Sequence, residues 1–207
     1  MDWKGFEVLK ACVEERLEEF SQIPDPRKGE LEGLAADIRS GVNENGSVHL
    51  IFICTHNSRR SHMSQLWAQF AAGFYGSGKV HCYSGGTEAT AFNSSAVGAM
   101  VEAGFQIDTE TPGSNPVYRV RFPGSGKDER VFSKQYTDPP NPSGGFIAVM
   151  TCSDADKACP VVRGASSRHP ITYDDPKVYD GNPDEHEGYV GRNRQIAREM
   201  LFLFSRV

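Results

Sequence analysis

One stretch of the chain constrains the fold more than any other: an apolar run, a short polar loop that begins with a cysteine, and a helical pattern follow one another directly. The run covers residues 48–53 and carries almost no charge, which is typical of a strand buried on both faces of a parallel sheet. Between residues 60 and 74, large apolar side chains recur at helical spacing. The loop at 54–59 is therefore expected between strand and helix, at the sheet edge where α/β proteins bind ligands.

The same two patterns alternate along the rest of the chain. A second apolar run at 146–151 predicts another buried strand, and residues 80–84 predict a shorter one. Helices are expected at 94–103, where Gly104 is a suitable C-terminal stop, and at 191–204. This alternation indicates an α/β fold, a doubly wound sheet of mostly parallel strands flanked by helices.

Two regions stand outside the alternation. Residues 1–45 carry two helical stripes, and we expect an N-terminal helical extension packed on the main domain, residues 46–207. The alternative is an arm that binds a partner. Residues 108–145 are rich in proline and glycine and read as an insertion, in which 117–122 and 130–134 could form a β-hairpin. Such an insertion either covers a site or decorates the fold.

Composition narrows the class of protein. The chain has 207 residues and a net charge of -5, which argues against nucleic acid as a main partner. It has no apolar run near the roughly 20 residues that span a membrane, and its first residues do not resemble a signal peptide. We therefore expect a cytoplasmic protein that does not bind membranes, and a monomer. The five cysteines, an odd number without a C-x2-C pair, argue against both a disulfide scaffold and a structural zinc site.

The loop after the first strand has the chemistry of an oxyanion site. Cys54 and Arg60 stand in C-x5-R spacing at the start of a helix, whose positive end favours a reactive thiolate. Arg60 can clamp two oxygens of a tetrahedral anion, and the Ser61 hydroxyl can hydrogen-bond the thiolate. The alternative is a buried structural cysteine before a basic helix start. The residues expected to contact the oxyanion are Thr55, His56, Asn57, Ser58, Arg59 and Ser61.

This run resembles the signature loop of low-molecular-weight protein tyrosine phosphatases and of the thioredoxin-coupled arsenate reductases that share their fold. The resemblance covers about residues 47–205, without the 108–145 insertion. The loop departs from both families at His56, where they usually have glycine, and at Arg59, where they usually have a second cysteine. His56 either tunes the loop or faces solvent, and Arg59 either adds positive charge beside the anion or faces water.

Two further motifs extend the resemblance. Asp174-Asp175-Pro176 matches the acid loop of the family, which makes Asp175 the general acid that protonates the leaving oxygen. Residues 152–160 resemble the redox segment of the arsenate reductases in the spacing of Cys152 and Cys159 and in the Ser-Asp-Ala-Asp core. Taken alone, Asp-Asp-Pro is a common turn and the two cysteines could simply be buried; Cys12 and Cys82 have no matching role.

The resemblance implies a three-thiol reaction. Cys54 attacks arsenate, Cys152 displaces arsenite to form a Cys54–Cys152 disulfide, and Cys159 passes that disulfide outward to a thioredoxin-like dithiol. On one intact helix, Cys152 and Cys159 would lie roughly 10 Å apart, whereas a disulfide needs Cα atoms within about 7 Å. We therefore expect this segment to rearrange on oxidation.

Other functions remain open at this point. The main alternative is a phosphatase that hydrolyses phosphotyrosine in proteins or small phosphomonoesters through a phosphocysteine at Cys54. A second is a non-catalytic protein that binds phosphate or sulfate. Some arsenate reductases of this type bind potassium near the loop; Asn57 and Ser84 match residues used there, but Gln65 stands where a glutamate would. We expect no required metal and no cofactor.

Overall fold

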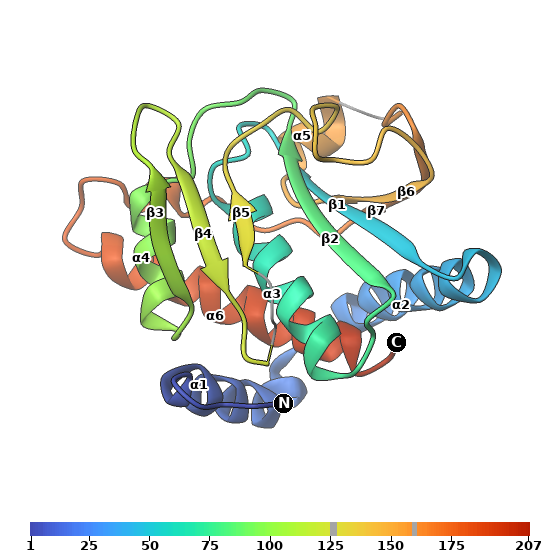
Figure 1. Ribbon diagram of the computed structural model, residues 1–207, viewed down its shortest axis with the longest axis horizontal. Coiled ribbons are helices and arrows are strands. Elements are labelled where there is room, and N and C mark those ends of the chain that lie inside the picture. The colour runs from blue at the N-terminus through green and yellow to red at the C-terminus, as the bar shows by residue number, and fades with distance from the viewer. Residues whose placement is uncertain (125–127, 159–160) are drawn as a thin grey trace.

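A four-stranded parallel sheet forms the centre of the molecule. The computed structural model describes residues 1–124, 128–158 and 161–207. The strands lie side by side in the order β2, β1, β6 and β7 (Figure 1). Their bounds are Val80–Gly86, Val48–Cys54, Phe146–Met150 and Ala165–Pro170. The first three confirm the predicted strands. From β1 the chain moves outward to β2 and later crosses to β6 on the other side of β1, so the carboxyl ends of β1 and β6 meet at a topological switch point.

Alternate residues of the strands enter two different apolar clusters. Leu50 and Phe52 point into the larger one, which joins residues of α3 (Arg60–Phe74), α6 (Glu185–Phe204) and the N-terminal helices. Ile51 and Ile53 point into a smaller one, closed by α5 (Ser153–Ala158) and the segment around Tyr136. The sheet is therefore covered on both faces by helices, as the α/β prediction required.

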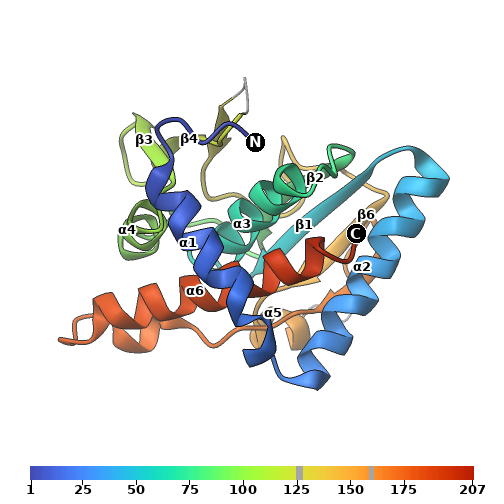
Figure 2. The ribbon, with the colours of Figure 1, turned by 90° about the horizontal axis from the view of Figure 1, so that it is seen from below.

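The N-terminal segment forms α1 (Glu7–Glu18), a 3-10 turn (Glu19–Gln22) and α2 (Asp25–Asn45). Both helices pack on α6, and Figure 2 shows α1 crossing it. Arg27 of α2 bonds the carboxylate of Glu199 at 2.8 Å and the carbonyl oxygen of Thr172 at 3.0 Å. Through Arg27 this segment supports the stretch that leads to Asp175.

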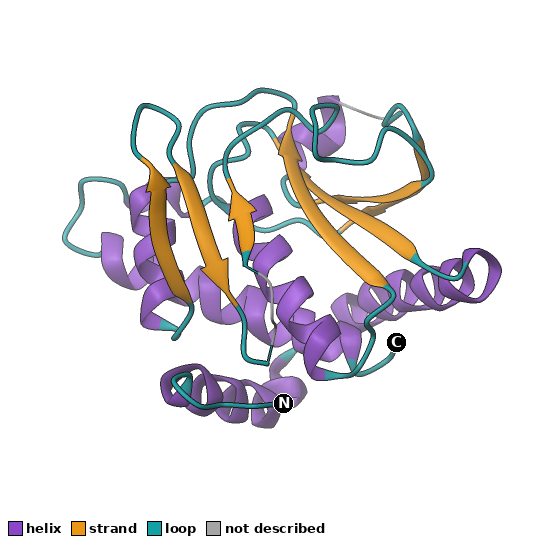
Figure 3. Cartoon of the chain, viewed as in Figure 1, coloured by secondary structure: helices purple, strands orange, loops and turns teal. Residues whose placement is uncertain are grey.

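The region between β2 and β6 contains α4 (Ser94–Glu102) and a small antiparallel sheet beside β2 (Figures 1 and 3). Its strands are β3 (Gln106–Thr111), β4 (Val117–Arg121) and β5 (Glu129–Val131). The pairing of β4 with β5 confirms the predicted hairpin, part of whose turn lies outside the described residues. The prediction was wrong about its second arm, which ends at Val131 rather than at 134, because Lys134 bonds to β2 instead.

The last helix was also predicted too short. α6 begins at Glu185 rather than at 191, and Gly188 in its first turns is a poor helix former. Glycine is needed there because a Cβ would lie 2.2 Å from the ring of Tyr179. Tyr179 ends a 3-10 turn, η2 (Pro176–Tyr179), which follows Asp175. Within the described residues, no helix combines the length and the apolar character needed to cross a membrane.

Candidate active site

Cys54 is the last residue of β1 and lies at the switch point, almost fully buried. Its Sγ is 3.1 Å from Oγ of Ser61 in the first turn of α3. Asn57 donates from Nδ2 to that same Oγ at 2.9 Å, and its Oδ1 accepts the backbone N–H of Lys134 at 2.9 Å. Because the Ser61 oxygen already accepts from Asn57, its one hydrogen is free to point at the Cys54 sulfur.

The loop backbone is arranged for an anion. The carbonyl oxygens of Cys54, Thr55, His56 and Ser58 accept hydrogen bonds from residues outside the loop. In a trans peptide the N–H points opposite to the carbonyl oxygen. The N–H groups that follow these four carbonyls therefore point away from the residues that bond the carbonyl oxygens. Asn57 adopts a positive φ of 44°, a conformation that asparagine tolerates better than most residues. Such a curved run of amides is an anion-binding concavity.

Gly86 at the end of β2 lets the loop lie this close to the sheet. A Cβ there would meet the carbonyl oxygen of Glu88 at 2.2 Å and both N of Asn57 and the carbonyl oxygen of Thr55 at 2.7 Å. All three are backbone atoms, so no side-chain movement could relieve the contact. Glycine at this position is therefore a requirement of the loop itself.

Arg60 and Asp175 contact each other. Arg60 is buried at the start of α3 and donates at 2.9 Å to the carbonyl oxygen of Tyr173 and at 2.6 Å to Oδ2 of Asp175. Asp175 caps η2 by accepting the N–H of Lys177 at 3.0 Å. Pro176 holds the residue before it in extended backbone. The clamp and the carboxyl group that sequence analysis assigned to one site are thus brought together, whereas Asp174 is exposed and pairs with Arg192 at 3.2 Å.

The two unusual loop residues behave differently. The side chain of His56 is 48 % exposed, with Nε2 3.8 Å from the Glu88 carboxylate, so it faces solvent. Arg59 does not face water: its side chain is 13 % exposed and bonds Tyr189 and Asp180. The alternative in which Arg59 faces water is wrong, and the alternative in which it adds positive charge beside the anion stays a prediction.

Cys152 lies just beyond β6, next to the loop. It is fully buried in the same apolar cluster as Cys54. Its Sγ lies 3.6 Å from Oγ1 of Thr55 and accepts the N–H of Ala155 at 3.3 Å. Cys159 lies outside the described residues. Of the two cysteines without a predicted role, burial raises the pKa of Cys12 and holds that of Cys82 well above its ordinary value, which suits packing rather than reaction.

The residues that matched a potassium site already have partners. Asn57 is bonded to Ser61 and Lys134, and Oγ of Ser84 lies 3.1 Å from Nδ1 of His62. Burial, together with the nearby charge of Lys134, holds the pKa of His62 well below its ordinary value, so this imidazole is neutral. Over the described ranges, no three His, Cys, Asp or Glu side chains gather as a metal site would require.

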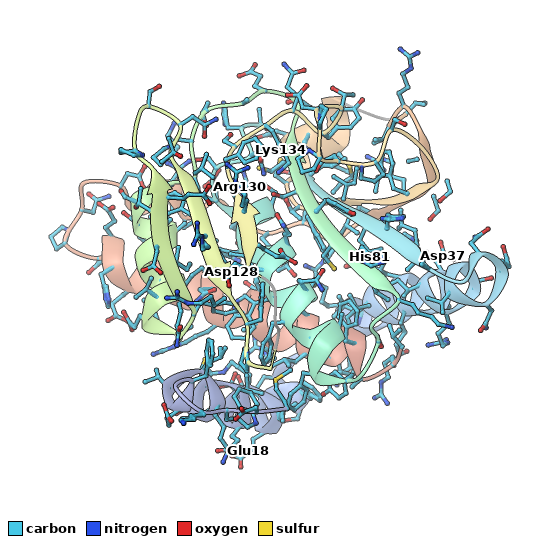
Figure 4. The ribbon with its side chains drawn as sticks, viewed as in Figure 1. Glu18, Asp37, His81, Asp128, Arg130 and Lys134 are labelled. Carbon is cyan, nitrogen blue, oxygen red and sulfur yellow. The ribbon has the colours of Figure 1, made fainter. Side chains whose placement is uncertain are left out.

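Sequence analysis missed the residues that support the loop from outside. Ser133 donates to the carbonyl oxygen of His56 at 3.0 Å, and Lys134 fixes Asn57 through its backbone. Both follow β5 in the presumed insertion, and Lys134 (labelled in Figure 4) lies between the small sheet and β2. These contacts run mostly through backbone atoms, so no residue pattern could have revealed them. The insertion is therefore part of the site's support.

Comparison with known proteins identifies relatives of the chain. No protein-family model matches the chain. A curated relative from Staphylococcus epidermidis, named arsenate reductase 2, is 32 % identical over 127 residues, which is 61 % of this chain and 77 % of the relative. The arsenate reductase of Bacillus licheniformis is 28 % identical over 156 residues, 75 % of this chain and 94 % of the relative.

Solved structures show the shared fold. The low-molecular-weight protein tyrosine phosphatase of T. tengcongensis superposes with a TM-score of 0.54 at 16 % identity, over 78 % of this chain and 100 % of that one. A YwlE mutant from Bacillus subtilis gives a TM-score of 0.52 at 16 % identity, over 77 % and 97 % of the two chains. The chain is therefore an enzyme that belongs to the superfamily of arsenate reductases and low-molecular-weight protein tyrosine phosphatases.

Proposed function

We propose that this enzyme is a thiol-dependent arsenate reductase in which Cys54, Cys152 and Cys159 act in turn. One observation carries the proposal: a second buried thiol, Cys152, lies beside the oxyanion loop, with its sulfur 3.6 Å from the side chain of Thr55. A phosphatase does not need this thiol. The relatives named arsenate reductase support the same substrate.

The reaction begins with arsenate in the loop. The Cys54 thiolate attacks arsenic(V) and a sulfur–arsenic bond forms, while one oxygen leaves as water after Asp175 protonates it. Arg60 holds two of the remaining oxygens. The Ser61 hydroxyl lies 3.1 Å from the attacking sulfur, and the loop amides balance the charge of the anion.

The second thiol performs the reduction. Cys152 attacks the Cys54 sulfur, a disulfide forms, the sulfur–arsenic bond breaks, and its electron pair leaves with arsenic as arsenite. The N–H of Ala155 donates a hydrogen bond to the attacking Cys152 sulfur. Cys159 then attacks Cys152 and releases Cys54, and a thioredoxin-like dithiol supplies the two electrons that reduce the Cys152–Cys159 disulfide.

The last exchange requires α5 to change. Arg168 of β7 donates to the carbonyl oxygen of Asp156 at 2.6 Å and also bonds its carboxylate, which fixes α5 to the sheet. Formation of the Cys152–Cys159 bond has to release this contact. Amide exchange across residues 152–162 should therefore be faster in the oxidised enzyme. Equal protection in both redox states would contradict the relay.

The test is a coupled assay of NADPH consumption with arsenate, thioredoxin and thioredoxin reductase. The native enzyme should consume NADPH steadily in an arsenate-dependent way, and Cys152→Ser should abolish consumption. Cys12→Ser, which removes a thiol outside the site, should behave like the native enzyme. Arsenate turnover that survives Cys152→Ser would exclude the relay.

The second candidate is hydrolysis of phosphomonoesters, including phosphotyrosine in proteins, through a phosphocysteine at Cys54. The contact of Asp175 with Arg60 favours it, since this acid is placed for any leaving oxygen. A chromogenic aryl phosphate distinguishes the two: hydrolysis should survive Cys152→Ser because it needs no second thiol. Hydrolysis of the aryl phosphate with no arsenate-dependent NADPH consumption would favour the phosphatase.

A further inference from the structure

Two consecutive arginines at the end of the oxyanion loop each hold a carboxylate of the same neighbouring segment. Arg60 bonds Asp175 at 2.6 Å. Arg59 bonds Oδ2 of Asp180 at 3.0 Å through one terminal nitrogen and the hydroxyl of Tyr189 at 2.7 Å through Nε. The Tyr189 hydroxyl donates to Oδ1 of Asp180 at 2.6 Å, so Arg59, Asp180 and Tyr189 each bond both of the others.

This closed set of three, hereafter the Arg59 latch, is partly sheltered from solvent: the Asp180 side chain is 37 % exposed, and the other two are more buried. The ring of Tyr189 is buried in the core, and the side chain of Arg59 is 13 % exposed. Burial, together with the hydrogen bond to Asp180, raises the pKa of Tyr189 to about 12, so its hydroxyl remains a neutral donor at physiological pH. A shielded, multiply bonded ion pair of this kind contributes more than an exposed one.

Arg60 and Arg59 cannot serve the same purpose. Arg60 holds Asp175 through one terminal nitrogen, while its buried Nε has no partner among the described residues and is available to an oxyanion. A bound oxyanion therefore shares the Arg60 guanidinium with Asp175, and a second tie between this segment and the loop keeps Asp175 in place at the step in which it donates a proton. The latch lies at the other end of η2, five residues further on, and its donors are directed at protein atoms instead of at the loop interior.

We propose that Arg59 is a positioning residue: the latch keeps the 175–180 segment closed on the oxyanion loop, and so keeps Asp175 in place, while Arg60 also binds the substrate. The proposal rests on the proposed function, in which Asp175 protonates the leaving oxygen. The single turn η2, braced by the Tyr179 ring against Gly188, transmits the restraint from Asp180 to Asp175.

The kinetic test uses the coupled arsenate assay with four variants. Arg59→Gln and Asp180→Asn should each lower kcat by about tenfold, since a displaced acid loses most of its effect. KM should stay within about twofold, because the bonded Arg59 nitrogens are directed at Tyr189 and Asp180. Arg59→Lys, which can reach only one of the two partners, should have a kcat between those of Arg59→Gln and the native enzyme. Arg192→Gln, which removes the exposed pair with Asp174 in the same segment, should match the native enzyme.

A double variant shows whether Arg59 acts through Asp175. Asp175→Asn already lacks the acid that the latch positions, so adding Arg59→Gln to it should lower kcat no further. Independent, multiplicative losses would overturn the proposal. So would a higher KM with an unchanged kcat, which would make Arg59 an anion-binding residue.

A second measurement needs no turnover and so separates this proposal from the proposed function. With inorganic phosphate as the probe, amide exchange at Asp180 and Asn182 should be at least about fivefold faster in Arg59→Gln than in the native protein. Arg192→Gln should leave those amides unchanged. This measurement tests the latch even if the native enzyme does not reduce arsenate. Equal amide exchange in Arg59→Gln and in the native protein, with both proteins melting cooperatively, would overturn the latch.

Discussion

Asp175 accepts a 2.6 Å hydrogen bond from Arg60, the guanidinium expected to clamp the oxyanion. The negative charge of Asp175 and that of a bound oxyanion would therefore compete for the same guanidinium. Replacing Asp175 by asparagine removes the negative charge while the amide keeps nearly the same shape. Asp175→Asn should lower kcat by about 100-fold, the ordinary contribution of a general acid, and should bind inorganic phosphate more tightly than the native enzyme. Calorimetry and steady-state kinetics on one preparation check both effects; weaker phosphate binding would contradict the competition.

The chain of hydrogen bonds that ends on Cys54 predicts how reactive this thiol is. Lys134 orients Asn57, Asn57 orients Ser61, and the Ser61 hydroxyl contacts the Cys54 sulfur. Ser61→Ala removes this contact with the nucleophile and should slow alkylation of Cys54 by iodoacetamide at neutral pH by about tenfold. Ser64→Ala is the matched control: its buried hydroxyl, on the same helix, has no partner among the described residues. Equal alkylation rates in the two variants would exclude this role for Ser61.

Two titratable groups in and after β5, the half-buried Glu129 and the buried Lys134, predict how stability depends on pH. Burial raises the pKa of Glu129 to about 7 and lowers the pKa of Lys134 to about 8. For Glu129, the native state binds the proton more tightly than the unfolded chain, so its contribution is lost as pH rises from about 4.5 to 7. For Lys134 the native state binds the proton less tightly, so its contribution grows as pH rises from about 8 to 10.5.

Urea unfolding at a series of pH values checks both signs. Glu129→Gln should remove part of the decrease in stability between pH 4.5 and 7, and Lys134→Met should remove part of the increase between pH 8 and 10.5. Lys10→Met is a control, since Lys10 is half exposed and pairs only with Glu14 on its own helix. A pH profile that neither Glu129→Gln nor Lys134→Met alters would show that these groups titrate normally.

The centre of the fold and the position of the loop that begins at Cys54 were predictable from sequence for one reason. The strand at 48–54 and the helix at 60–74 are buried, so their apolar patterns are strong and long, and they fix where the loop between them lies. The partners of the loop come from elements that carry no such pattern. β7 (Ala165–Pro170) was missed because its residues are mostly polar and it lies at the edge of the sheet, where one side needs no partner strand.

The small antiparallel sheet was harder to predict from sequence than β7. β3 (Gln106–Thr111) is largely exposed, so its sequence does not alternate between apolar and polar residues. Its pairing with β4 is what makes it a strand. Arg59 was ambiguous for a related reason: its partners Asp180 and Tyr189 lie more than a hundred residues away, and only the closure of the sheet brings them to the loop. Local pattern predicts local structure, whereas these contacts are long-range.

Gly86 offers the sharpest test of how the sheet supports the loop. Its missing side chain lets the backbone of Thr55 and Asn57 pass within 2.7 Å of where a Cβ would stand. Gly86→Ala must therefore push the loop outward, and we expect kcat/KM to fall by at least about tenfold, because the amides and the Cys54 sulfur lose their mutual alignment. Phosphate binding should weaken in parallel, since the same amides hold the anion.

Gly98→Ala is the control: this exposed position in α4 has open space around it, so alanine should stabilise the protein by about 0.5 kcal/mol and leave activity unchanged. Measuring both variants by thermal melting and by turnover separates the two effects; a Gly86→Ala enzyme with native turnover would mean that the oxyanion loop does not depend on its contact with β2.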